Sequence, residues 1–343
     1  MIYHLYAGGY TSALHHLLLN TAAPSLRPIR ACPADNPSWL TLSGDRLYAA
    51  SELEEGGAVT GWKVRRDGAL LPLGRLDTPG RLLCHLEPLP GGYLACANYG
   101  SGSLLTVSTA ADGRPDWMTA LIRHSGHGLN PERQEAPHVH CCALHPDGVR
   151  LFVADLGLDR VFCYAFSSDG GLTPRPDQDL PFPPGAGPRH LAFAEGRSLL
   201  LAVTELGNQL HVFREVEGRW QEVSRGEVLP AGYAQEALSA ALRLSPDGRR
   251  AYVSCRGADI VTVFTLAADG RLTRLADFPS GGHWPRDLLL SPDGAVLLAA
   301  NQLSGAIALF PLDPETGLPA GDPISVECES VSSLVCVPAA KKG

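Results

Sequence analysis

A pattern that returns about every fifty residues is the feature of this chain that most limits its fold. Each copy contains several apolar residues and then a small or polar pair, often with Gly behind it. The copies are LYAASEL (47–53), LACANYG (94–100), LFVADLG (151–157), LLAVTEL (200–206), AYVSCRG (251–257) and LLAANQL (297–303). A seventh copy, YHLYAGGY at 3–10, continues the same spacing when the count passes from the last residue to the first. A repeat that runs on across the two termini indicates a closed ring.

Strand and turn signals flank every copy of the pattern. A second short apolar run follows each one, such as AVTGWKV, RVFCYAF or DIVTVFTL, and its β-branched and aromatic residues are typical of strands. Pro-Asp-Gly turns lie upstream at 145–148, 245–248 and 291–294, and further Asp-Gly turns lie downstream, a dipeptide that suits hairpins. Each repeat therefore predicts a four-stranded antiparallel sheet, and seven such sheets around one axis make a β-propeller.

The predicted fold class is all-β, with residues 1–343 forming a single seven-bladed β-propeller domain. We expect residues 3–10 to share a blade with the C-terminal ISVECESVSSLVCVPA, because pairing of the first and last strands closes the ring and covers its edges. Two stacked sandwiches are the competing all-β arrangement, and they leave the spacing across the termini unexplained. Helical periodicity is visible only around 234–243.

Composition, charge and cysteine usage limit which partners and which cellular compartment the sequence predicts. Hydrophobic residues make up 45% of the chain and charged residues 19%, which excludes disorder as the main state. The net charge is −8 and no Lys/Arg cluster occurs, so nucleic acid is not an expected partner. None of the nine Cys forms C-x-x-C, which favours small core residues in a reducing compartment. No basic leader and no apolar run of ~18 residues is visible, so we expect a cytoplasmic protein with no membrane partner.

Two sets of polar residues recur at equivalent places and are expected to converge on the central channel. The first set lies where the repeated patterns end: Gly8, Tyr10, Glu52, Asn98, Asp155, Glu205, Arg256 and Asn301. The second set lies upstream, on the loops that lead into each sheet: Asn36, His138, His140, Arg189, His190 and Arg286. Core packing alone does not require polar residues at these places, so the channel is the expected site of chemistry.

Several of these residues also have a purely structural interpretation. His138 and His140 suit exposed turns, a hydrogen-bonded core position or a metal site, but no further ligands stand out, so no metal is predicted. Arg189 suits a buried salt bridge between blades, with Asp155 or Glu205 as its partner. Asn98 and Asn301 suit strand ends, where they bond to the backbone. Glu205 follows the apolar LLLAVT, so its carboxylate must be paired or have a raised pKa.

Five stretches carry a resemblance to a known family: NPERQEAPHVH (130–140), DLGLDRVFCY (155–164), GAGPRHLAF (185–193), TELGNQLHVF (204–213) and SPDGRRAYVSCRGADIVTVF (245–264). Together they resemble the bacterial 6-phosphogluconolactonase and muconate-lactonising family of seven-bladed propellers. The resemblance covers nearly the whole chain. It implies a metal-independent enzyme with no cofactor and a small anionic sugar lactone as its substrate.

The resemblance also implies a set of pocket residues, because fungal members of the family use a His, two Arg and a Glu. The His falls on His140 or His138, one Arg on Arg189 and the Glu on Glu205. The second Arg falls on Arg256, with Arg286 as its substitute. SELEEGG and the segment 71–92 depart from the family pattern, which leaves the substrate open.

The leading hypothesis is hydrolysis of a lactone such as 6-phosphogluconolactone. His138, His140 or Glu205 would take a proton from the attacking water, and Arg189 would stabilise the oxyanion. The remaining candidates for substrate binding are Glu52, Asn98, His190, Arg256, Arg286 and Asn301. One alternative is lactonisation of a carboxymuconate by the same residues. The other is a non-catalytic propeller that binds a small ligand or protein, although the G-H and W-D signatures of the common propeller scaffold are missing.

Overall fold

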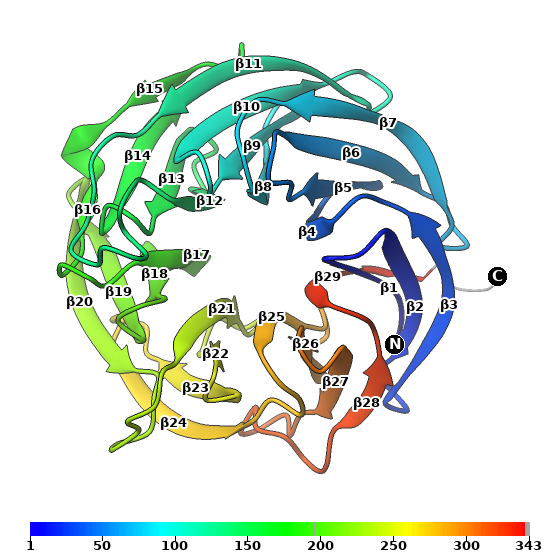
Figure 1. Ribbon diagram of the computed structural model, residues 1–343. Coiled ribbons are helices and arrows are strands. Elements are labelled where there is room, and N and C mark those ends of the chain that lie inside the picture. Colours follow the sequence, from blue (N-terminus) through cyan, green and yellow to red (C-terminus); the bar gives the residue numbers. More distant parts are fainter. Residues whose placement is uncertain (195, 340–343) are drawn as a thin grey trace.

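Seven antiparallel sheets stand around a central channel in the computed structural model, which describes residues 1–194 and 196–339 (Figure 1). The innermost strands are β4 (Pro37–Ser43), β8 (Leu83–Leu89), β12 (Val139–Leu144), β17 (Pro188–Ala194), β21 (Leu238–Leu244), β25 (Pro285–Leu290) and β29 (Val331–Pro338). The repeated sequence pattern forms the second strand of each sheet: β5 (Arg46–Ser51), β9 (Tyr93–Asn98), β13 (Arg150–Asp155), β18 (Leu199–Thr204), β22 (Arg250–Arg256), β26 (Val296–Asn301) and β1 (Ile2–Gly9). The seven-bladed propeller predicted from the repeat is confirmed.

Two further strands complete each blade on its outer side. The third strands are β6 (Gly57–Val64), β10 (Ser103–Thr109), β14 (Arg160–Phe166), β19 (Gln209–Val216), β23 (Ile260–Leu266), β27 (Ala306–Pro311) and β2 (Ala13–Asn20). The outermost strands are β7 (Leu70–Thr78), β11 (Pro115–Arg123), β15 (Leu172–Pro174) with β16 (Leu180–Pro181), β20 (Arg219–Glu227), β24 (Leu272–Pro279), β28 (Ile324–Glu327) and β3 (Ser25–Pro33). Four-stranded blades are thus the rule, with a fifth short strand in one of them.

The N-terminal and C-terminal strands pair and close the ring, as expected. β1 lies antiparallel to β29, with Tyr3 opposite Pro338 and Gly8 opposite Ser333. The expectation for the C-terminal segment is wrong in one detail. Its first part, β28, pairs with β27 in the preceding blade, and only β29 joins β1. The turn over Cys328–Ser330 separates the two strands, so the segment spans two neighbouring blades.

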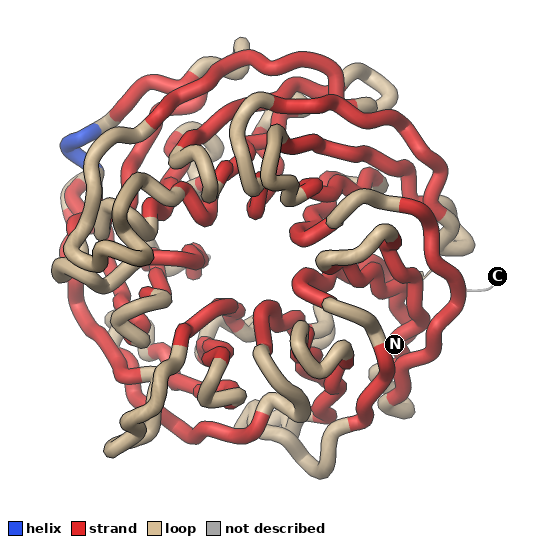
Figure 2. Tube along the Cα trace, viewed as in Figure 1, coloured by secondary structure: helices blue, strands red, loops and turns tan. Residues whose placement is uncertain are grey.

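Strands and turns account for almost all of the chain (Figure 2). The only helix among the described residues is a 3₁₀ turn at Pro176–Gln178, and no helix in that part is long and apolar enough to span a bilayer. The helical periodicity around 234–243 is misleading, since a loop leads there into β21. The Asp-Gly turns form as predicted. Gly170 has φ +85°, and a Cβ there would lie 2.4 Å from the Thr119 hydroxyl, so only Gly fits this turn.

The hydrophobic core is divided into seven layers, each packed between two neighbouring blades. One layer joins the first and last blades through Leu5 and Leu17 on one side and Leu298 and Ile307 on the other. All nine Cys are free; seven are buried and two are half-buried, in agreement with the expectation that they are core residues. Because apolar side chains fill the space between blades, polar side chains on the inner strands are left to face the channel.

Candidate active site

Every innermost strand has a β-bulge near its start, and these bulges mark the candidate site. In each blade the register between the first and second strands shifts near one mouth of the channel, so that the inner strand holds one residue more than its partner. Such a β-bulge bends the strand and re-aims a side chain. The bulged residues are Ser38, Cys84, His140, Arg189, Ala240–Ala241, Arg286 and Ser332. Three of the residues predicted for the site therefore occupy equivalent bulges in different blades.

A buried carboxylate held by three guanidiniums lies at the centre of this mouth. Glu205, directly after β18, is 2% exposed. Its Oε2 accepts hydrogen bonds from Arg189 Nε at 2.8 Å and from Arg256 Nη2 at 2.7 Å. Its Oε1 accepts a hydrogen bond from Arg133. Burial opposes ionisation of Glu205, but Arg256, Arg189 and Arg133 outweigh it and hold its pKa well below the ordinary value.

The two strand-borne arginines are also anchored to the backbone. Arg189 donates from Nη1 to the Ala240 carbonyl at 2.8 Å, and Arg256 donates from Nε to the Leu238 carbonyl at 3.3 Å. Burial and the neighbouring Arg256 lower the pKa of Arg189 to about 10, so Arg189 remains charged at neutral pH. Within the described residues, Nη2 of Arg189 and Nη1 of Arg256 make no hydrogen bond. Each arginine thus retains free donors while its position is fixed.

His140 is the histidine that lies among these charges. Burial and the charge of Arg189 lower its pKa well below 6.5, so its imidazole is neutral at physiological pH. Its Nδ1 is buried and has no hydrogen-bond partner among the residues that the structure describes. Its ring lies 5.7 Å from the Tyr99 ring and 5.8 Å from the His190 ring, centroid to centroid. His140 is therefore neutral, and no donor or acceptor among the described residues holds its Nδ1.

His138 lies close to His140 but has other partners. Its ring stacks on Tyr99 at 4.3 Å, and its Nδ1 is 3.0 Å from the Tyr99 carbonyl oxygen. Its Nε2 is 3.3 Å from Glu135 Oε1. Both ring nitrogens of His138 thus face oxygen acceptors, whereas His140 has a nitrogen without a partner. The geometry favours His140 over His138 as the base, a choice that the sequence left open.

Arg286, Tyr10 and Glu52 form a second charged group, on other blades of the ring than Glu205. The Arg286 guanidinium lies 5.2 Å from the centre of the Tyr10 ring, and the Tyr10 hydroxyl donates to Glu52 Oε2 at 2.9 Å. Burial disfavours the charge on Arg286, but Tyr10 and Glu52 more than compensate and raise its pKa. No hydrogen bond or ion pair holds the Arg286 guanidinium within the described part of the chain. The structure thus brings Glu52 and Arg286 together, with free donors on Arg286.

The remaining predicted residues lie deeper in the fold. Asn98 and Asn301 are 0% exposed; Asn98 donates to Ser103 Oγ at 3.1 Å and Asn301 to the Ser280 carbonyl at 3.0 Å. Both therefore tie loops together at the ends of second strands. His190 follows the Arg189 bulge, and its ring packs 5.3 Å from the Trp39 ring. Asp155 binds the His138 backbone N–H at 2.8 Å and His124 Nδ1 at 2.6 Å, away from Arg189.

Two residues of this site escaped the sequence analysis. Arg133 lies within the NPERQEAPHVH stretch, and Tyr99 directly follows the pattern residue Asn98. Tyr99 follows β9 directly, as Glu205 follows β18 and Glu52 follows β5, but the candidate taken from that blade was its neighbour Asn98. Arg133 lies in a loop, away from any strand end or bulge. The charge of Arg133 is the signal that could have drawn attention to it, because a buried Glu205 carboxylate requires cationic partners.

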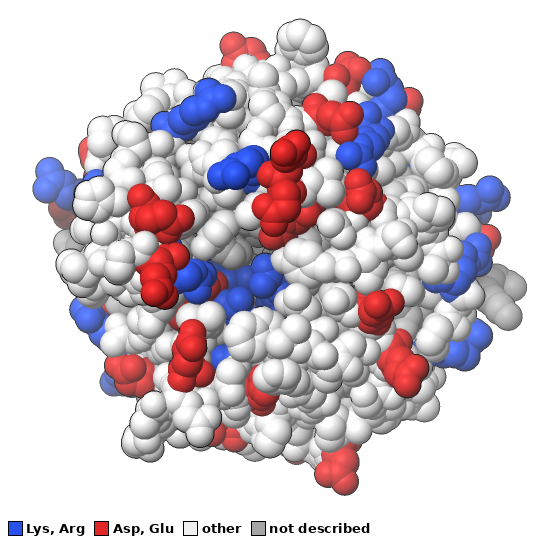
Figure 3. Space-filling view, in the orientation of Figure 1, with Lys and Arg blue, Asp and Glu red and all other residues white. Residues whose placement is uncertain are grey.

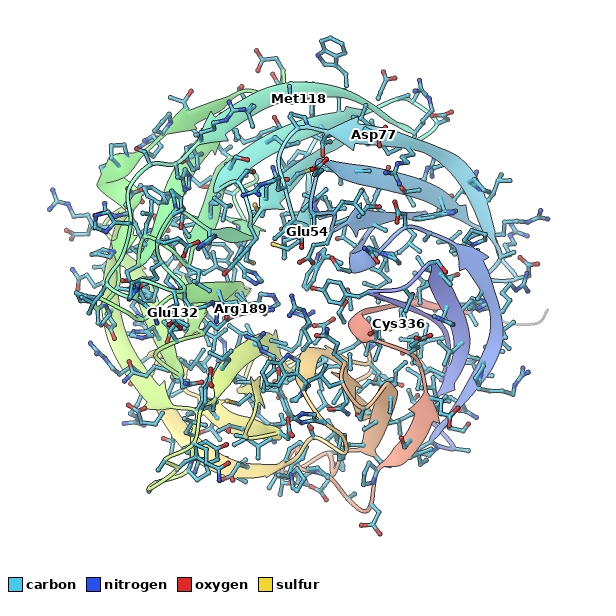
Figure 4. The ribbon with its side chains drawn as sticks, viewed as in Figure 1. Glu54, Asp77, Met118, Glu132, Arg189 and Cys336 are labelled. Atoms are coloured by element: carbon cyan, nitrogen blue, oxygen red, sulfur yellow. The ribbon has the colours of Figure 1, made fainter. Side chains whose placement is uncertain are left out.

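The mouth is positively charged. Figure 3 shows Lys and Arg atoms gathered in a central hollow, with acidic side chains around it, and Figure 4 shows Arg189 at the edge of the opening. Four guanidiniums, those of Arg133, Arg189, Arg256 and Arg286, share the mouth with the carboxylates of Glu205 and Glu52. Within residues 1–194 and 196–339, no three His, Cys, Asp or Glu side chains are grouped to hold a metal ion.

Comparisons with known proteins agree with this architecture. Residues 4–337 match the family described as "Lactonase, 7-bladed beta-propeller". A 6-phosphogluconolactonase of Bacillus subtilis (strain 168) is 29% identical over 320 residues, which cover 91% of this chain and 90% of that protein. A solved structure of the Pseudomonas aeruginosa periplasmic gluconolactonase superposes with a TM-score of 0.93 at 30% identity and covers 99% of this chain and 100% of that one. A solved protein from Lactobacillus plantarum gives a TM-score of 0.92 at 29% identity, covering 98% and 100%. This chain is a lactonase, and it belongs to the seven-bladed β-propeller lactonase family.

Proposed function

We propose that this enzyme hydrolyses a phosphorylated sugar lactone, 6-phosphogluconolactone, to its open-chain acid without a metal ion. The observation that carries the proposal is the excess of cations at the channel mouth, where four guanidiniums face two carboxylates. A dianionic phosphate ester balances that excess, and Arg binds phosphate through parallel N–H donors. The name of the Bacillus subtilis relative agrees with this substrate.

The first step is attack of water on the lactone carbonyl carbon. Neutral His140 takes a proton from the water as its oxygen bonds to carbon, and the carbonyl oxygen becomes an oxyanion. The free Nη donors of Arg189 and Arg256 stabilise that oxyanion. Glu205 holds both guanidiniums in place and stabilises the imidazolium that forms on His140.

The second step opens the ring. The tetrahedral intermediate reforms a carbonyl and breaks the bond between carbon and the ring oxygen. The His140 imidazolium returns its proton to the departing alkoxide, which becomes a hydroxyl group. The product is the open-chain acid, whose new carboxylic acid group loses a proton to solvent and becomes a carboxylate. All atoms of the lactone and one water are accounted for, and His140 is again neutral.

The side chains at the mouth support the proposal that no metal ion is needed. Glu205, the carboxylate at the centre of the mouth, already has three guanidiniums as partners and offsets only part of their charge, so a metal cation placed there would be repelled. Oxyanion stabilisation, the usual task of a metal ion in such hydrolysis, falls to Arg189 and Arg256. The chemistry of the residues thus fits an anionic ligand better than a metal.

The test is a lactonase assay in the presence and absence of EDTA, with 6-phosphogluconolactone, glucono-δ-lactone and a carboxymuconate offered separately. We expect hydrolysis of 6-phosphogluconolactone well above the spontaneous rate, unchanged by EDTA. Arg189→Met should abolish most of this activity. Preferential formation of a lactone from the carboxymuconate, or loss of activity with EDTA, would contradict the proposal.

A further inference from the structure

Arg133 is held differently from the other two partners of Glu205. The side chains of Arg189 and Arg256 are 3% and 5% exposed, and both also bond to backbone carbonyls. The Arg133 side chain is 32% exposed, and its only other partner within the described residues is the Tyr99 hydroxyl at 3.4 Å. Of the three guanidiniums, Arg133 alone can leave Glu205 without breaking a hydrogen bond to the backbone.

The loop that carries Arg133 is nevertheless fixed. Gln134 is 0% exposed, and its Nε2 donates to the Leu156 carbonyl at 2.9 Å and to Asp159 Oδ1 at 2.7 Å. Its Oε1 accepts hydrogen bonds from two loop amides at 3.1 and 3.0 Å. The backbone N–H of Arg133 itself donates to Asn130 Oδ1 at 3.1 Å. The backbone of this loop is therefore fixed, whereas the Arg133 side chain can change its partner.

The two oxygens of Glu205 depend on different arginines. Oε2 is bound by Arg189 and Arg256, whereas Arg133 binds Oε1. If Arg133 moved away, Glu205 would keep two cations and remain ionised in place. A phosphate dianion carries more charge and more acceptor oxygens than one carboxylate oxygen, so it can compete for this guanidinium. Arg286, which has free donors, offers a second cation to the same group.

We propose that Arg133 is a specificity-determining residue that moves from Glu205 Oε1 to the phosphate of a phosphorylated sugar lactone. The inference deepens the proposed function and rests on it. An unphosphorylated lactone offers no anion, so Arg133 then stays on Glu205. Arg133 thus selects between substrates by their charge and takes no part in the bond-making steps.

The test compares Arg133→Met and Arg133→Lys with a matched control, Arg81→Met. Arg81 is an exposed arginine whose Nη2 donates to the Gly100 carbonyl at 2.9 Å, and it has no contact with Glu205. The measured quantity is the ratio of kcat/KM for 6-phosphogluconolactone to kcat/KM for glucono-δ-lactone. We expect Arg133→Met to lower this ratio about 10- to 100-fold, mainly through KM of the phosphorylated substrate. Arg133→Lys should restore part of the ratio, and Arg81→Met should leave it unchanged.

A second measurement makes the result independent of turnover. Inorganic phosphate is titrated calorimetrically into the wild-type protein and the three variants. We expect Arg133→Met to weaken phosphate binding at least about tenfold, with Arg81→Met behaving as wild type. Equal losses of kcat/KM on both lactones, or unchanged phosphate affinity in Arg133→Met, would overturn the inference. A wild-type protein inactive on both lactones would refute the proposed function, and the phosphate titration would still decide the role of Arg133.

Discussion

The two ends of the central channel are built from the same seven strands, yet they shift the pKa of a buried carboxyl group in opposite directions. At the near mouth, three guanidiniums hold the pKa of Glu205 well below its usual range. Farther along, Asp287 has one cation, Arg243 at 2.6 Å, and burial raises its pKa. At the far end, the only partner of the Glu87 carboxylate among the described residues is the Leu144 N–H at 3.1 Å, and burial raises the pKa of Glu87 to about 7. The number of nearby cations, more than depth, decides the charge of each carboxyl.

Neutral rings separate the two ends. Trp39 stacks on His85 at 4.3 Å, and His190 lies between this pair and His140. Beyond them lies a cavity of about 350 Å³ that includes Glu87 and Arg243 among largely apolar side chains. Free positive charge is thus concentrated at the near mouth, which is why the proposed chemistry is placed there.

The largest expected effect is on catalysis at the near mouth. His140→Gln should lower kcat about 100- to 10,000-fold, because it removes the general base. His85→Gln, the matched change within the layer of neutral rings, should leave kcat within about threefold, since the His85 ring nitrogens face Cys141 Sγ and the Cys142 N–H, each at 3.4 Å. Both values come from initial rates with 6-phosphogluconolactone after subtraction of the spontaneous hydrolysis. Equal losses in the two variants would remove the distinction between the two ends.

The next largest effect is on stability. Glu205→Gln leaves three guanidiniums without their carboxylate and should cost about 3–5 kcal/mol in the free energy of unfolding at pH 7. Asp287→Asn should cost less, about 1–2 kcal/mol, because the Asp287 carboxylate gains less from its single cation than it loses by burial. Urea unfolding of both variants measures the difference. A larger loss for Asp287→Asn would mean that the cations at the near mouth do not stabilise Glu205 as described.

The third effect is a loss of stability at low pH. Burial lowers the pKa of His85 to about 3 and those of His140 and His190 well below 6.5. The unfolded chain takes up protons on these groups below about pH 6.5 whereas the folded chain does not, so stability should fall as the pH drops from 6.5 towards 4. His85→Gln should remove about 3 kcal/mol of this loss at pH 4. The free energy of unfolding of wild type and variant at pH 7 and pH 4 tests this; parallel losses would contradict it.

The smallest expected effect is also on stability. It arises at the far end of the channel, and here stability is lost as the pH rises. The folded-state pKa of Glu87 is raised to about 7, so Glu87 favours folding below pH 4.5 and this contribution is lost as the pH rises through 7. Glu87→Gln keeps the neutral form at every pH. It should therefore stabilise the protein by about 2–3 kcal/mol at pH 8 and by less than about 1 kcal/mol at pH 5. Thermal unfolding at the two pH values measures this, and equal shifts at both would count against a raised pKa.

The sequence predicted the ring because the repeat and its Asp-Gly turns are local signals. It also singled out His140, Arg189, Glu205, Arg256 and Arg286, since these residues break apolar strands at equivalent places. It could not distinguish His140 from His138. The β-bulge that makes His140 the extra residue of β12 depends on pairing with β13, where Val139 lies opposite Asp155 and Cys141 opposite Ala154.

Partners brought in from distant loops were harder to predict. Arg133 reaches Glu205 across 72 positions of sequence, and only the closed ring brings the two together. The assignment of Asn98 and Asn301 to substrate binding also followed from their equivalent positions. Their side chains are completely buried and bond to loop and backbone atoms, which equivalence of position alone could not reveal.

The most direct test of the account is a crystal structure of the protein soaked with 6-phosphogluconate, the product of the proposed reaction. We expect the ligand at the near mouth, with its phosphate bound by Arg133 and Arg286 and its new carboxylate beside His140, Arg189 and Arg256. A ligand bound in the cavity beside Glu87 and Arg243, or on the outer surface of the blades, would contradict the placement of the chemistry at the cationic mouth.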